Sequence, residues 1–168
     1  MRNSYRKIKK VRELLRRDDF DEAVEEISRF PARKAINQLI SLLYSTDEKI
    51  QQRAVTVIGI VVSRLAVHDI ESARVIMRRL MWSLNDESGG IGWGAPEAMA
   101  EIMARNNKLA DEYYKILISY ASPGCNYLEH EGLQRSVQRG IERLAIKRPE
   151  GTCKKQSTHP ACPFSSLK

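Results

Sequence analysis

The feature that most constrains the fold of this chain is a recurrence of similar residues every 41 positions. A constant step of this length is typical of two-helix units that hide their apolar sides by stacking on one another. Small residues at one point of each unit would let neighbouring units approach closely. The step aligns the small residues Ala54, Ala95 and Ser136, and the apolar sets Ile36, Met77 and Ile118; Leu39, Leu80 and Ala121; and Val62, Met103 and Leu144.

Apolar residues also recur every three or four positions, which is the spacing of one helix face. This pattern predicts eight helices and no strand, with clear ranges at 47–66, 70–84, 109–121 and 129–147. The first range is rich in Val and Ile and would also suit a strand, but about 20 residues exceed ordinary strand length. Because this segment is apolar on most of its circumference, we expect it to be the central helix. Asp69 is expected to cap the helix that follows.

The composition is that of one ordinary soluble domain, with 168 residues, 42% hydrophobic and 29% charged. The longest apolar run, 54–62, is much shorter than the roughly 20 residues that cross a bilayer, so no membrane segment is expected. Basic residues stand where a signal peptide would have its apolar stretch, which predicts a cytoplasmic protein. Three cysteines, an odd number, argue against a disulfide framework.

The net charge of +7 is concentrated at the two ends of the chain. Residues 1–20 hold eight Lys or Arg against three acids, and residues 147–168 hold five against one. The body, 21–146, has 15 bases and 17 acids, a balance of −2. Phosphate binding needs clustered cations, so the basic termini could contact nucleic acid but the body is a poor candidate.

Three stretches resemble HEAT repeats and the phycobilisome-lyase-type HEAT-like repeat family. They are the segment from Asp47 through Arg53 and Ala54, "LNDESGGIGWGAPEAMAEI" and "LQRSVQRGIERLA". The likeness covers about residues 31–148 and implies a short right-handed α-solenoid of three stacked antiparallel helix pairs. We expect residues 1–30 to form an N-terminal helical cap and residues 149–168 to be a disordered tail.

The same resemblance bears on individual side chains. The family's usual arginine before the second helix of each unit is present as Arg53 and Arg135. Gly94 replaces it in the middle unit, so the familiar ladder of aspartates and arginines is expected to be interrupted there.

A glycine-rich loop surrounds Trp93 and contains Gly89, Gly90, Gly92 and Gly94. Its G-x-G-x-x-A string would suit a dinucleotide, but that fingerprint requires a preceding strand, and a helix end is expected there. The interpretation we favour is an extended turn in which glycines adopt positive φ and Trp93 folds back onto the stack. An alternative is an exposed start of the next helix that attracts an acidic partner.

Glu97 and Glu101 share one helix face, where they could act as a carboxylate pair or as metal ligands. With Arg105 at the next step, a solvated row of ion pairs explains them more simply. His130 and Glu131 resemble the His-Glu pairs of HEAT-repeat deoxyhypusine hydroxylases. Because the chain has one such pair where several are required, a di-iron enzyme is not expected.

The C-terminal segment contains Cys153, His159 and Cys162. Zinc sites usually need four ligands in tight pairs, so no metal or other cofactor is expected. The chain also ends without a polar capping helix in view, which leaves its last repeat exposed or completed by another chain.

Two classes of function remain. The first is a non-catalytic protein-interaction or scaffold module that binds a protein or peptide on a concave face and on inter-helix loops. Its anchors would be Trp93, Glu97, Glu101, His130 and Arg135, and interface hot spots rich in aromatic residues and arginine would extend to Arg74, Arg78 and Arg79. The alternative is a nucleic-acid-binding protein with the architecture of the HEAT-like alkylpurine DNA glycosylases.

Overall fold

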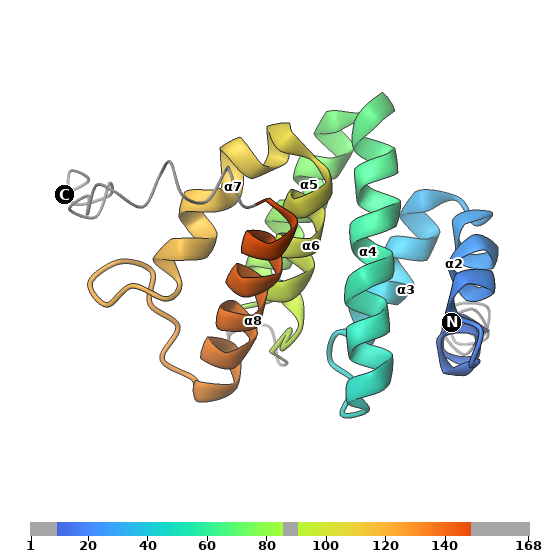
Figure 1. The fold of residues 1–168 in the computed structure, drawn as a ribbon, viewed down its shortest axis with the longest axis horizontal. Coiled ribbons are helices and arrows are strands. Elements are labelled where there is room, and N and C mark those ends of the chain that lie inside the picture. The colour runs from blue at the N-terminus through green and yellow to red at the C-terminus, as the bar shows by residue number, and fades with distance from the viewer. Residues whose placement is uncertain (1–9, 86–90, 149–168) are drawn as a thin grey trace.

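The computed structural model describes residues 10–85 and 91–148, and over these ranges the protein is all-α, with no strand (Figure 1). Residues 10–16 are helical. Seven further helices follow: α2 (Phe20–Ser28), α3 (Ala32–Leu42), α4 (Glu48–His68), α5 (Ile70–Trp82), α6 (Ala95–Arg105), α7 (Asn107–Ser119) and α8 (Glu131–Lys147). The predicted helical class is therefore confirmed.

Short polar side chains fix where most of these helices begin. Each cap accepts a hydrogen bond from a backbone N–H of the first turn, which would otherwise have no partner. Asp69 does so at 2.9 Å from the nitrogen of Ser72, as expected from the sequence. The helix expected at 109–121 begins earlier, at Asn107, because Asn106 caps it and alone separates α6 from α7. The other aspartate caps are Asp19 for α2 and Asp47 for α4.

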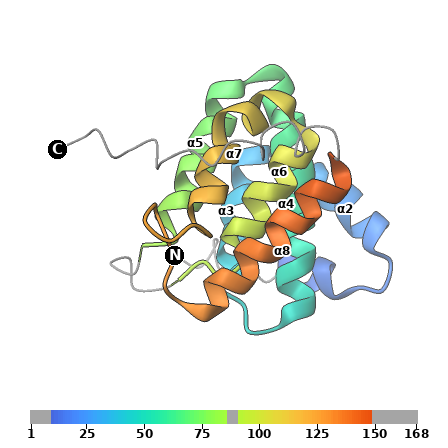
Figure 2. The same cartoon turned by 60° about the vertical axis from the view of Figure 1, so that its left-hand side comes forward.

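Helix α6 occupies the middle of the helical array. It packs against α4 and α8 on its two sides and also contacts α5 and α7 (Figures 1 and 2). All residues from Ala95 to Met103 are buried. The apolar circumference of α4 predicted a central position for that helix, and it does pack against α3, α5 and α6. Buried residues nevertheless extend around more of the circumference of α6 than of α4.

By length and composition alone, α4 is long and apolar enough to cross a membrane, and it is the one helix in 10–85 and 91–148 with this property. More than half of the apolar stretch is buried inside the protein. A helix that is apolar around most of its circumference also suits the core of a helical domain, so the composition of α4 carries little weight for a membrane location.

Small residues let α4, α6 and α8 approach one another. Ala54, Ala95 and Ser136, which the 41-residue step aligns, lie on these three helices and are almost completely buried. Gly140 of α8 faces α6 so closely that a Cβ atom added to it would lie 3.1 Å from the carbonyl oxygen of Pro96. The spacing of the backbones therefore depends on side-chain size at these positions.

Polar contacts join α3, α5 and α7. Arg74 of α5 binds Glu112 of α7, with its Nε 2.8 Å from Oε2, and also Glu71 of its own helix. These hydrogen bonds raise the pKa of Arg74, and the hydrogen bond from Arg74 lowers the pKa of Glu112. Two further bonds link α5 to α3: Arg79 to Asn37, and Arg33 to Ser72.

Arg53 of α4 binds the end of the first helical segment. Its Nη1 donates to the carbonyl oxygen of Leu15 at 2.9 Å and to that of Arg17, while its guanidinium lies 5.1 Å from the ring centre of Phe20. An arginine at this point satisfies carbonyls that have no partner within their own helix. These contacts are with backbone oxygens rather than with an aspartate of a ladder.

Candidate functional site

The described part of the glycine loop, residues 91–94, packs tightly and does not use the backbone freedom that we expected of it. Within the described residues, the only positive-φ glycine is Gly124, in the connection between α7 and α8. Gly94 has φ −89°, and a Cβ atom there would come within 3.1–3.3 Å of the side chain of Leu43, which follows α3, and of side chains on α4. A Cβ atom on Gly92 would meet Ser83. The positive-φ prediction is therefore wrong for Gly92 and Gly94, where close packing is the reason for glycine; Gly89 and Gly90 lie outside the described residues.

The start of α6 is not an exposed anion site. Ala95, Glu97 and Ala98 have no exposed surface, and Gly94 is buried as well. The amide groups of this first turn therefore face the protein rather than solvent. Glu97 itself supplies a negative charge in the first turn, which is where the helix dipole favours one.

Trp93 folds back onto the core, as the sequence suggested. Its ring meets the ring of His130 edge to face, with 4.7 Å between centroids and 63° between planes. His130 also caps α8, because its Nδ1 accepts a hydrogen bond from the nitrogen of Gly132 at 3.0 Å. The structure thus brings two predicted anchors together, and the cap explains why α8 begins at Glu131 rather than at 129.

Glu97 is fully buried between α4, α6 and α8, with 0% of the residue exposed. Its Oε1 accepts a hydrogen bond from Nε of Arg139 at 2.9 Å. Its Oε2 accepts one from Nε2 of Gln52 at 2.8 Å and lies 3.7 Å from Nη2 of Arg143. Arg139 also reaches Glu48 at 3.6 Å. One carboxylate therefore joins all three helices.

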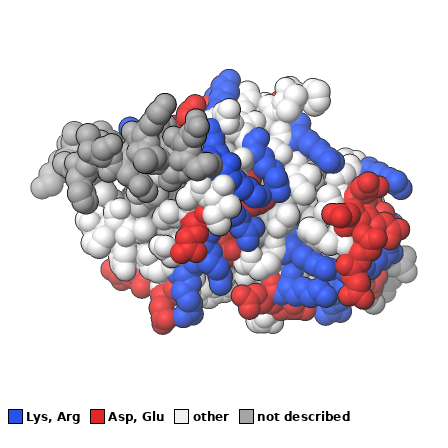
Figure 3. All heavy atoms as spheres, in the orientation of Figure 1, with Lys and Arg blue, Asp and Glu red and all other residues white. Residues whose placement is uncertain are grey.

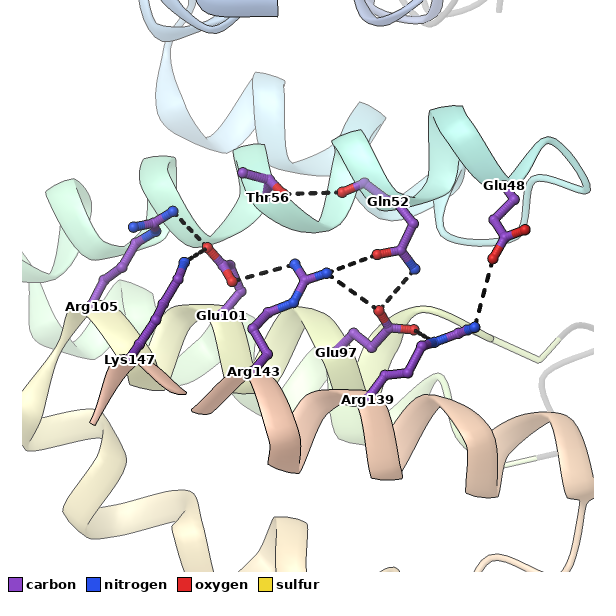
Figure 4. Close-up of polar contacts among 9 residues, drawn as sticks. All are labelled: Glu48, Gln52, Thr56, Glu97, Glu101, Arg105, Arg139, Arg143 and Lys147. Carbon is purple, nitrogen blue, oxygen red and sulfur yellow. Dashed lines mark hydrogen bonds and ion pairs between the residues drawn. The ribbon is translucent and has the colours of Figure 1, made fainter. Parts of the chain in front are cut away.

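Glu101, one turn later, is 1% exposed and has three cationic partners. Its Oε1 lies 2.6 Å from Nη2 of Arg105 and 2.5 Å from Nζ of Lys147. Its Oε2 lies 3.4 Å from Nη1 of Arg143, whose Nη2 donates to Oε1 of Gln52 at 2.9 Å. Arg143 therefore links both buried glutamates (Figure 4). We call this group the carboxylate–cation cluster: Glu48, Gln52, Glu97, Glu101, Arg105, Arg139, Arg143 and Lys147.

The expected ion pair between Glu101 and Arg105 is confirmed, but the expectation that the glutamates are solvated is wrong. Helical spacing within one segment cannot show that another helix covers the face concerned. Here α8 covers it and supplies cations, so two carboxylates can be buried with compensation for their lost hydration.

The cations of the cluster lie at the surface above the buried carboxylates. Four positive side chains face three negative ones, which leaves a balance of +1. The exposed fraction of the cationic side chains ranges from 27% for Arg143 to 44% for Arg139. Lys and Arg side chains form a band over this front face, with acidic atoms visible between them (Figure 3). The glutamates are engaged in holding these cations, and the outward parts of the cations remain accessible to a partner.

Sequence reasoning missed most of this cluster. Arg139, Arg143, Lys147 and Gln52 were not among the predicted anchors, whereas Arg135 was. Arg135 is exposed and pairs with Glu131 of its own helix at 2.6 Å, outside the cluster. A usable signal was present: both Glu97 with Arg139 and Glu101 with Arg143 are 42 residues apart, one more than the repeat step.

The residues considered as metal ligands form no site in the part of the chain that the structure describes. Across 10–85 and 91–148, no group of three His, Cys, Asp or Glu residues is arranged to hold a metal ion. Cys153, His159 and Cys162, for which no metal was expected, lie outside the described residues. The outer face of α8, expected to be uncovered, carries mainly polar exposed residues, with Ile146 as an apolar exception.

Comparison with known proteins finds one similar sequence, described as an uncharacterized protein of Archaeoglobus fulgidus, which is 40% identical over 79 residues. The match covers 47% of this chain and only 39% of the archaeal protein, so the chain spans about two fifths of its relative. No protein-family model matches the chain, and no solved structure matches it either.

Proposed function

We propose that the chain is a non-catalytic interaction module of the HEAT-like type. In this proposal α3 with α4, α5 with α6 and α7 with α8 are antiparallel pairs of a short right-handed solenoid. The buried small residues at 41-residue intervals and the side-by-side packing of α4, α6 and α8 support it. The second helices of the three pairs would then share one binding face.

The observation that carries the proposal is the burial of Glu97 and Glu101 beneath a row of partly exposed cations. Two apolar side chains of similar volume would stabilise a helix interface at least as well as a buried ion network. The network, however, also fixes the directions of the cationic side chains, which lowers the entropy lost when they bind an acidic surface. We therefore propose a protein or peptide partner that presents carboxylates to Arg139, Arg143 and Lys147.

A nucleic acid is the second candidate because Arg135, Arg139, Arg143 and Lys147 follow one another every fourth residue along α8. The glutamates beneath most of this row argue against nucleic-acid binding, since they neutralise the positive charge that would otherwise attract phosphates. The two candidates differ in their dependence on salt: phosphate binding should weaken steeply as the salt concentration rises.

The test compares the double variant Arg139→Ala/Lys147→Ala with the control Arg16→Ala/Arg29→Ala, which removes the same charge from exposed positions elsewhere. When the chain is used as bait for affinity capture from the native cytoplasm, the partner protein should be lost only with the first variant. Circular dichroism and the thermal midpoint of each variant establish that it folds. Equal capture by both variants would refute the proposed face, and salt-sensitive retardation of duplex DNA that only the first variant abolishes would favour the second candidate.

A further inference from the structure

The outer face of α5 carries an exposed apolar pair, on a different helix from the carboxylate–cation cluster of α4, α6 and α8. Val75 and Trp82 are seven residues apart, so they lie on the same side of the helix. Val75 is 55% exposed and Trp82 is 74% exposed. A tryptophan offers more apolar area for burial than any other side chain, and this one has most of its area in solvent.

Two arginines flank this apolar pair. Arg78 lies beside Tyr113 of α7, where its charge opposes part of the rise that burial causes in the pKa of Tyr113. Arg79 lies on the other side and donates a hydrogen bond to Asn37 of α3. Both arginines are exposed, and neither forms an ion pair with a carboxylate of the described residues. We call Val75, Arg78, Arg79 and Trp82 the outer α5 face.

Within the described residues, the acids that bind Arg74 on this side of the protein are already paired. Glu71, one turn before Val75, pairs with Arg74, and Arg74 also binds Glu112 of α7. Among residues 10–85 and 91–148, the two charges of Arg78 and Arg79 therefore remain in excess beside the apolar pair. Tryptophan and arginine together are the residues most enriched among interface hot spots.

We propose that the outer α5 face docks an acidic amphipathic segment of another protein. An apolar side chain of the partner packs on Trp82 and Val75, and its carboxylates bind Arg78 and Arg79. This assignment goes beyond the function proposed above, because it uses a different layer of helices and does not require the cluster to bind anything.

The charges of the face argue for this occupant over a second copy of the chain. Two outer α5 faces would bring like charges together in a symmetric dimer. The acidic helix α2 of a second copy would supply carboxylates, but its apolar residues Ala23, Val24 and Ile27 are buried in its own core. A separate acidic segment with an exposed apolar side would supply carboxylates for the two arginines and an apolar surface for Val75 and Trp82.

The direct test uses synthetic helical peptides with leucines on one face. One peptide carries glutamates on the opposite face, a second carries lysines there, and a third keeps the glutamates but has serines instead of leucines. Fluorescence anisotropy of the labelled peptides measures their affinity for the full chain. We expect the glutamate–leucine peptide to bind. The affinity of each of the other two peptides should be lower by a factor of about ten or more.

Variants then locate the binding. Arg78→Glu/Arg79→Glu and, separately, Trp82→Ala should each weaken binding of the glutamate–leucine peptide by about tenfold, whereas the exposed-charge control Arg16→Ala/Arg29→Ala should leave it unchanged. In a Trp93→Phe background, the emission of Trp82 should shift to the blue on binding. If Trp93→Phe does not fold, the anisotropy series alone decides.

Several outcomes would overturn the proposal: no binding of the glutamate–leucine peptide, equal binding of the lysine peptide, or full affinity after Arg78→Glu/Arg79→Glu. Loss of peptide binding in Arg139→Ala/Lys147→Ala alone would move the acidic partner to the cluster. That result would support the function proposed above while refuting the outer α5 face. Binding of phosphatidylserine vesicles in preference to every peptide would make the face a lipid contact and would also refute it.

Discussion

Gly59 of α4 lies directly against Glu101 of α6, without room for a side chain between them. A Cβ atom added to Gly59 would lie 3.1 Å from the backbone carbon of Glu101 and would overlap its Cγ. The glycine therefore sets how closely α4 approaches the helix that carries both buried glutamates. Gly140 has the corresponding position on α8, where it meets Pro96 and Ala100.

Gly59→Ala should destabilise the protein by about 1–3 kcal/mol, because overpacking this contact outweighs the better helix propensity of alanine. Urea unfolding followed by circular dichroism measures the change. Ser63→Ala, a half-buried position one turn later on α4, serves as the control and should leave the unfolding free energy nearly unchanged. Higher stability of Gly59→Ala would show that α4 and α6 have room to separate.

Arg143→Leu should cost about 2–4 kcal/mol of unfolding free energy, since it removes a partner from both buried glutamates. Arg135→Leu is the matched control, because Arg135 lies on the same helix but pairs only with the exposed Glu131. That control should change stability by less than about 0.5 kcal/mol. Similar costs for the two variants would contradict the importance assigned to the cluster.

Alkaline pH should destabilise the fold through Tyr120. Burial raises the pKa of this hydroxyl from 10.0 to about 12. The unfolded chain therefore loses the proton first, so the stability contributed by the neutral hydroxyl is complete below pH 10.0 and is lost as the pH rises towards about 12. Spectrophotometric titration should show a late tyrosine component that Tyr120→Phe removes; the same curve in both proteins would refute the assignment.

The two tryptophans should respond differently to a soluble quencher. Trp82 is mostly exposed, whereas Trp93 packs on the core and against His130. Acrylamide should therefore quench Trp93→Phe, which retains Trp82, much more strongly than Trp82→Phe. Equal quenching constants in the two variants would contradict these environments, and free tryptophan provides the upper limit for comparison.

Local patterns predicted the helical content well because their causes lie within a few residues. Apolar spacing predicted the segments, and Asp69 marks a helix start because a carboxylate three residues before a free N–H is a local arrangement. The alignment of Ala54, Ala95 and Ser136 also identified buried positions on three helices that pack together. The arrangement of these helices as a right-handed solenoid remains a prediction.

The candidate site could not be read in the same way because its causes are distant in the chain. Glu97 and Glu101 have the four-residue spacing of an exposed ion-pair row, and only the position of α8 shows that they are buried. Arg135 was selected from a family pattern, although the three cations of α8 that reach the glutamates lie one, two and three turns later on that helix. A search for opposite charges separated by one residue more than the repeat step would have found Arg139 and Arg143.

The contacts of α8 also determine when the chain can finish folding during synthesis. Three of the four cations that surround Glu97 and Glu101 belong to this helix. Until α8 has emerged from the ribosome, both glutamates of the nascent chain must stay hydrated. Helix α6 therefore cannot yet become fully buried. The centre of the protein is therefore completed by α8, which is synthesised after the other helices of the described residues.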